Sequence, residues 1–109
     1  MHEPPPEERR KSTRVAWDGR VKLAGVKTLT GRILNVSEGG LLVEATGSRF
    51  APGNEVIATF TLPGRDKPIA ARSEVVRQEG SGRIGLRFLR LDAEEQKAIA
   101  AYVRESASG

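Results

Sequence analysis

The chain has 109 residues and a formal net charge of +4, and this length predicts one domain able to bury a core without metals or disulfides. It contains no cysteine, which excludes disulfides, thiolate nucleophiles and zinc-finger ligand sets. No apolar run approaches the roughly 20 residues of a membrane-spanning helix, so we expect a soluble, cytoplasmic protein without membrane insertion.

Charge is distributed unevenly along the chain. The first eight residues, MHEPPPEE, are acidic and rich in proline, and they predict a flexible N-terminal tail over residues 1–8. Residues 9–32 carry eight Lys and Arg residues against Asp18 alone, a net +7, whereas basic and acidic residues cancel from residue 33 onward. This segment favours an anionic partner: a nucleotide, nucleic acid or a membrane surface. Scattered charge that only keeps the protein soluble is the alternative.

Six short segments alternate between apolar and polar residues, which is the pattern of half-buried β-strands. They span residues 20–23, 29–34, 41–45, 56–62, 69–75 and 84–88. Pro63-Gly64 ends the fourth segment, and the glycines at 80 and 82 predict a hairpin turn between the fifth and the sixth. Six strands at this spacing predict a small antiparallel barrel or sandwich.

The pattern changes to helical spacing after residue 91. Asp92 and Glu95 form a predicted capping box, in which each side chain accepts a hydrogen bond from the other's backbone N–H. Ile99, Tyr102 and Val103 then lie on one stripe. We expect a helix that covers the core, with a partner-binding face as the alternative, and a short C-terminal tail over residues 106–109.

Two familiar kinds of functional motif are excluded. Residues 80–85, GSGRIG, match the G-x-G-x-x-G dinucleotide fingerprint, but an alternating strand follows where that motif requires a helix. The single histidine, His2, lies in the tail, and the carboxylates are dispersed among basic neighbours. The sequence therefore favours a binding module over an enzyme, with no catalytic residue, metal or cofactor predicted.

A basic cluster and a polar turn remain to be explained. Arg9, Arg10 and Arg14 precede the first strand, and arginine can grip a phosphate, pair with the O6/N7 edge of guanine or stack on a base. The stretch NVSEGG, residues 35–40, stands where two strands meet. Glu38-Gly39 can reverse the chain by itself, which would need neither Asn35 nor Ser37, so these polar residues suggest a second role.

Taken in order, Arg10-x-x-x-Arg14 and Asn35-x-Ser37-x-x-Gly40 resemble the RxxxR and (D/N)xSxxG motifs of the PilZ domain, a bacterial receptor family for cyclic di-GMP. The resemblance covers about residues 7–105 and includes the late strand IGLRF and the closing helix. It implies a PilZ domain over residues 9–105 that folds as a mainly β, six-stranded antiparallel barrel with a C-terminal α-helix. The ligand would lie outside the barrel, under the N-terminal arginines.

The resemblance also implies roles for the arginines. Arg10 and Arg14 would bind the phosphates and guanine edges of cyclic di-GMP. An arginine directly before the motif, here Arg9, is similar to family members that take up two mutually intercalated ligand molecules.

For the strand end, the resemblance implies contacts between Asn35, Ser37 and a guanine, with Gly39 and Gly40 completing the ligand site. Gly40 would leave space where a Cβ would obstruct the ligand. The family's alternative to Asn35 is Asp, whose two acceptor oxygens match the N1–H and N2–H₂ donors of guanine, whereas an amide offers one acceptor and a donor.

These roles describe a receptor that passes its signal to a downstream protein partner. We expect residues 7–14 to be mobile without ligand and to fold across the barrel when cyclic di-GMP neutralises the arginines. Two other classes stay open. One is a PilZ-like adaptor that binds only protein, and the other is a basic barrel that binds nucleic acid, which the scarcity of aromatic residues for stacking disfavours.

Overall fold

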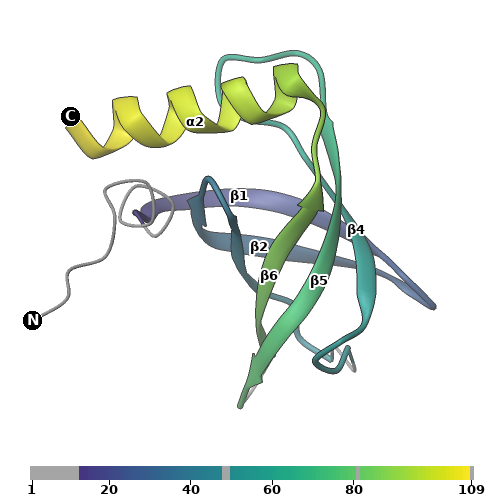
Figure 1. Ribbon diagram of the computed structural model, residues 1–109. Helices are drawn as coiled ribbons and strands as arrows, with labels where there is room; N and C mark the ends of the chain where they lie inside the picture. The colour runs from purple at the N-terminus through teal and green to yellow at the C-terminus, as the bar shows by residue number, and fades with distance from the viewer. Residues whose placement is uncertain (1–12, 48–49, 81, 109) are drawn as a thin grey trace, which may run out of the picture.

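The computed structural model describes residues 13–47, 50–80 and 82–108. Its strands form a closed antiparallel barrel in the order β1-β2-β3-β6-β5-β4, followed by one helix (Figure 1). The elements are β1 (Val15–Ala24), β2 (Thr28–Ser37), β3 (Gly40–Glu44), β4 (Glu55–Phe60), β5 (Ile69–Glu79), β6 (Arg83–Arg90) and α2 (Ala93–Ser108). The predicted six-stranded barrel with a C-terminal helix is confirmed.

Strand β1 closes the barrel because it pairs on both sides. It pairs with β2 from Val15 to Ala24, and its last three residues also pair with β4, where Leu23 lies opposite Ala58. The barrel is thus closed at the C-terminal end of β1, where the strand has a neighbour on each side.

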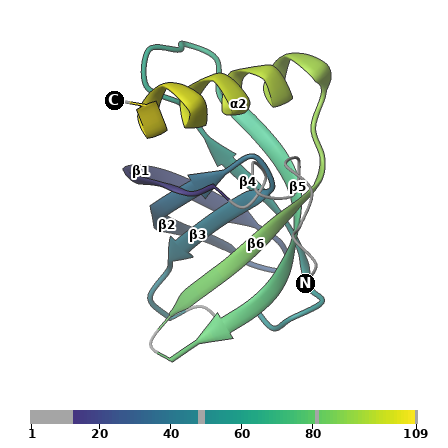
Figure 2. The same ribbon diagram turned by 60° about the vertical axis from the view of Figure 1, so that its left-hand side comes forward.

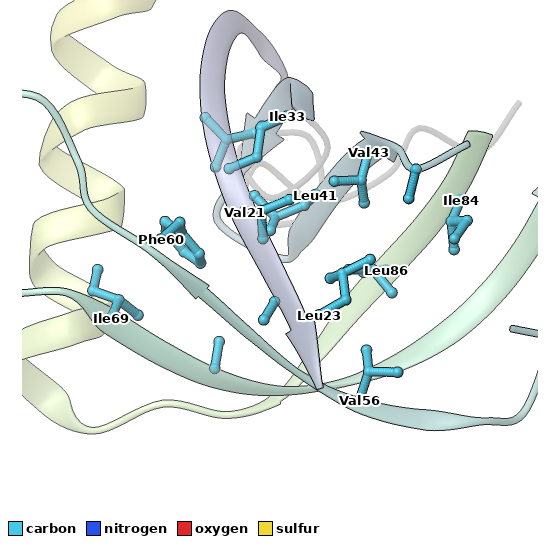
Figure 3. Packing of buried hydrophobic residues seen from close by; sticks show 14 of the residues in the cluster. Val21, Leu23, Ile33, Leu41, Val43, Val56, Phe60, Ile69, Ile84 and Leu86 are labelled. Carbon is cyan, nitrogen blue, oxygen red and sulfur yellow. The ribbon is translucent and has the colours of Figure 1, made fainter. Parts of the chain in front are cut away.

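Alternate residues of the strands fill the interior of the barrel. In β1, Val21 and Leu23 are buried while Lys22 between them is exposed, and each of the other strands contributes buried side chains to the same core. Figure 3 shows labelled members of this core from all six strands: Val21, Leu23, Ile33, Leu41, Val43, Val56, Phe60, Ile69, Ile84 and Leu86. Each such side chain stabilises the fold by about 1.5–3 kcal/mol when it leaves water.

Helix α2 lies across one end of the barrel in both views (Figures 1 and 2). The capping box at its start is confirmed: the Asp92 backbone N–H donates to Glu95 Oε1 at 3.1 Å, and the Glu95 N–H donates to Asp92 Oδ1 at 2.7 Å. Ile99 and Val103 are buried, so the apolar stripe covers the core as predicted.

Aromatic rings connect the helix to the barrel. The ring of Trp17 lies 5.6 Å from that of Tyr102 on α2 and 6.0 Å from that of Phe60 on β4. Such separations are typical of packed aromatic pairs. Trp17 therefore fills the rim between barrel and helix.

The turn between β5 and β6 contains Gly80 and Gly82, whose φ angles are +44° and +111°. These values lie in the region that favours glycine, and a strand rather than a helix follows the turn. The rejection of a dinucleotide-binding motif is thus confirmed. At the other end, α2 continues to Ser108, into the segment that the sequence assigned to a C-terminal tail. Within the described residues, no helix has the length and apolar character needed to cross a membrane.

We expect Ile99→Ala to lower the free energy of unfolding by about 2–5 kcal/mol, because Ile99 is 1% exposed and attaches α2 to the core. Urea unfolding followed by circular dichroism measures this. Lys97→Ala on the exposed side of the same helix is the control and should change stability by no more than about 0.5 kcal/mol. Equal effects of the two variants would contradict a covering role for the helix.

Candidate ligand-binding site

The structure brings together two residues that the sequence separates by 21 positions. Arg14 stands directly before β1, and Asn35 lies near the end of β2. The two strands pair so that Ala16 is opposite Asn35. Nη1 of Arg14 donates a hydrogen bond of 3.1 Å to Oδ1 of Asn35 at the protein surface. The structure therefore brings one residue of the RxxxR motif into contact with one residue of the (D/N)xSxxG motif on the outside of the barrel.

Asn35 points outward because β2 contains a bulge. Ile33 is buried and opposite Val43, so strict alternation would direct Asn35 into the core as well. Leu34 is an extra residue relative to β3, and the register shifts between Ile33 and Asn35. The bulge reverses the alternation and turns Asn35 to the outside while Val36 enters the core.

Ser37 holds the turn that follows. Its hydroxyl accepts hydrogen bonds of 3.2 Å from the backbone N–H groups of both Gly39 and Gly40, and it lies 3.4 Å from the Gly40 carbonyl as a donor. The side chain is only 2% exposed. The sequence argument assigned the reversal to Glu38-Gly39 alone, and the structure shows that the Ser37 hydroxyl is also bonded to this turn. Neither loop residue, Glu38 or Gly39, has the positive φ that is common in two-residue hairpins, and the hydroxyl satisfies two backbone N–H groups of the turn.

Gly39 and Gly40 do not have positive φ angles, and other glycines do. The glycines of the described chain that have them are Gly47, Gly53, Gly64, Gly80 and Gly82. Gly39 has a different part: its carbonyl accepts a hydrogen bond of 2.8 Å from the N–H of Phe88, which attaches the turn to β6. The turn is thus fixed by one buried side chain and by the neighbouring strand.

Gly40 is required by the fold. A Cβ at this position would lie 1.8 Å from the carbonyl oxygen of Leu86 on β6, with which β3 pairs here. Backbone cannot move aside as a flexible side chain can, so β3 and β6 approach this closely only with glycine. The sequence interpretation, in which Gly40 leaves space for a ligand, needs correction, because protein backbone fills that space.

The remaining predicted site residues are Arg9 and Arg10, which lie outside the described residues. The expectation of a mobile segment over residues 7–14 falls largely on the same part of the chain. Among the described residues, no group of His, Cys, Asp and Glu side chains could hold a metal ion.

Beside this turn lies a hollow, which the sequence did not indicate. It has a volume of about 420 Å³ and is lined by the turn, the end of β6 and the start of α2: Glu38, Gly39, Phe88, Leu89, Arg90, Leu91 and Gln96. Only the register between β3 and β6 places these residues together, so no motif in the sequence could have found them.

The described residues thus form a small closed barrel with an arginine and an amide side chain in contact at an outer strand end. The chain belongs to the PilZ domain family, whose family model matches residues 8–105. No curated protein matches the sequence.

Solved structures agree with this family. The fold is similar to the Bacillus subtilis inhibitor of motility MotI/DgrA, with a TM-score of 0.80 and 22% sequence identity. That match covers 98% of this chain but 57% of MotI/DgrA, so the chain spans little more than half of that protein. The PilZ domain of CeSA from a cellulose-synthesizing bacterium is also similar, with a TM-score of 0.68, 17% identity, and coverage of 86% of this chain and 97% of that domain.

We expect Ser37→Ala to lower the free energy of unfolding by about 1–3 kcal/mol, because it leaves the N–H groups of Gly39 and Gly40 without their acceptor. Thermal or urea unfolding measures the loss. Ser106→Ala, an exposed serine on α2, is the control and should be near neutral. A Ser37→Ala protein as stable as the control variant would contradict the structural role of the hydroxyl.

Proposed function

We propose that this protein is a bacterial cyclic di-GMP receptor that binds the dinucleotide on the outside of the barrel and passes the signal to a protein partner. Membership of the PilZ family supports the ligand class. The observation that carries the proposal is the contact between Arg14 and Asn35, because it joins a guanidinium and an amide that can both recognise guanosine phosphate.

The chemistry of the two side chains suits this ligand. The guanidinium of Arg14 is exposed and presents N–H donors in a planar fork, which matches a phosphate or the O6/N7 edge of guanine. Oδ1 of Asn35 can accept a hydrogen bond from a guanine N–H. In the free protein this oxygen is occupied by Arg14. Binding would therefore exchange one hydrogen bond for two: Asn35 would turn to the base and Arg14 to the ligand's acceptors.

Ser37 and Gly40 would contribute indirectly, by fixing the turn that follows Asn35. In the free protein the Ser37 hydroxyl is buried and bonded to the turn, and Gly40 sits against β6. Their proposed contribution is to hold the strand end, and hence Asn35, in the orientation that a guanine needs. This role is compatible with the motif because a one-residue slip would direct Asn35 into the core.

Arg9 and Arg10 would add further ligand contacts to those of Arg14 and Asn35. Arg10 is four residues before Arg14, so an extended chain could carry it at most about 14 Å from that residue. This reach would let both arginines contact one ligand, and Arg9 could serve a second, intercalated molecule. Ordering of this segment on the ligand is the proposed signal, and a protein partner would read the changed surface.

We expect isothermal titration calorimetry to show cyclic di-GMP binding to the wild type and binding weakened roughly 10–100-fold by Arg14→Ala, the worth of one hydrogen bond from a charged donor. Lys27→Ala is the matched control. It removes one positive charge from the same basic segment but lies in the turn between β1 and β2, far along both strands from Asn35. It should change the affinity by no more than about twofold, because exposed charges at that distance are screened by salt.

Absence of heat with folded wild-type protein would contradict the receptor function and favour the protein-binding adaptor. Binding of single-stranded or duplex DNA with a steep salt dependence would instead favour a nucleic-acid-binding barrel. The fitted stoichiometry tests Arg9: two ligand molecules are expected with the wild type and one with Arg9→Ala.

We expect Asn35→Asp to tighten cyclic di-GMP binding by about tenfold, because a carboxylate offers guanine two acceptor oxygens and makes stronger, charge-assisted hydrogen bonds. The same calorimetric titration measures this. Weaker binding by the Asp variant would show that the amide donor of Asn35 is used, or that the carboxylate holds Arg14 too firmly to release it.

A further inference from the structure

A row of outward-facing positions runs across four adjacent strands from the proposed site. Asn35 on β2 is opposite Leu42 on β3, Leu42 is opposite Gly85 on β6, and Gly85 is opposite Arg77 on β5. With a strand spacing of about 4.8 Å, the Cα atoms of Asn35 and Arg77 are about 14 Å apart along the sheet. Arg14 meets Asn35 at one end of this row, and Arg77 stands at the other.

A bulge turns Arg77 outward, just as the bulge in β2 turns Asn35. In β5, Ser73 and Val75 are fully buried, so strict alternation would direct Arg77 into the barrel. The register against β6 shifts between Val75 and Arg77, where Val76 is the extra residue and is 48% exposed. Bulges of this kind re-aim single side chains and are frequent beside functional sites.

Because Gly85 has no side chain, the side chain of Arg77 can lie flat on the outer surface of the sheet. An ideal Cβ at Gly85 would be 2.9 Å from Cγ of Arg77 and 3.1 Å from its Nε, so the arginine side chain runs along the sheet surface above this glycine. Although Gly85 faces outward, it is buried. The side chain of Arg77 thus extends from β5 over β6, and Leu42 on β3, which is partly exposed, is the next outward position in the row.

The arginine is only loosely held in the free protein. Its Nε lies 3.7 Å from a carboxylate oxygen of Glu79, and both side chains are 53% exposed. Exposed ion pairs of this length contribute little and are readily exchanged for a better partner. By comparison, Arg72 on the same strand pairs with Glu55 at 2.8 Å.

We propose that Arg77 is a further binding residue of the cyclic di-GMP site, donating N–H groups to a phosphate or a guanine edge from the side opposite Arg14, with Leu42 as the apolar floor between them. This inference rests on the proposed function. It makes the recognition surface a strip across β2, β3, β6 and β5, bounded by a guanidinium at each end. A strip of this length accommodates more of a flat, doubly charged dinucleotide than the strand end alone.

Calorimetric titration with cyclic di-GMP tests the role of Arg77. Arg77→Ala should weaken binding about tenfold or more, while the matched control Arg72→Ala, which removes an outward arginine from the same strand, should stay within about twofold of the wild type. Thermal unfolding of both variants shows whether the fold is kept.

A second variant moves the arginine without removing its charge. In Gly85→Ala the three atoms nearest to the new Cβ all belong to the flexible side chain of Arg77, so the barrel should fold while the guanidinium is pushed off the strip. We expect binding at least several-fold weaker than the wild type. The double variant Arg77→Ala/Gly85→Ala should then bind no more weakly than Arg77→Ala alone, since the glycine acts through the arginine.

The outcomes separate the two proposals. Wild-type affinity in Arg77→Ala, together with weakened binding in Arg14→Ala, would overturn the role of Arg77 and leave the receptor function standing. Absence of binding by the folded wild type would overturn both. Weakening by Arg77→Ala and by Gly85→Ala, with Arg72→Ala unchanged, would establish the strip.

Discussion

In a closed barrel, each strand residue points either into the core or out to solvent, and this constraint decides where a ligand can be held. Apolar side chains from all six strands fill the interior of the barrel. Polar groups that recognise a ligand therefore have to stand on the outer surface or at strand ends. Asn35 and Arg77 meet this requirement only because a bulge before each of them reverses the alternation of its strand.

The strand end that carries Asn35 is rigid for reasons that lie in the backbone. The buried hydroxyl of Ser37 satisfies two N–H groups of the turn, and Gly40 allows β3 to approach β6 more closely than any other residue would. Because these contacts also maintain the barrel, part of the (D/N)xSxxG pattern serves folding. Loss of binding in a Ser37 or Gly40 variant is then evidence about the ligand only if the fold is intact.

The turn that follows Asn35 also connects the proposed site to the end of β6 and the start of α2. The turn at Glu38-Gly39 is bonded to Phe88 on β6, and it borders the hollow formed with the start of α2. A ligand on Asn35 and Arg14 would thus sit within one turn of this hollow, which extends from the motif to β6 and α2.

The sequence by itself determined the strands, the helix with its capping box, and the order of the two motifs, because hydrophobic periodicity and capping are local properties that a chain displays directly. Only the tertiary structure decided which residues share the site. The alternation of β2 and β5 fails at Leu34 and Val76, and a bulge is defined by the register against a partner strand that the sequence does not show. The roles of Gly40 and Gly85 were hidden for the same reason: whether a missing Cβ admits a ligand, a backbone or an arginine depends on the strand that lies opposite.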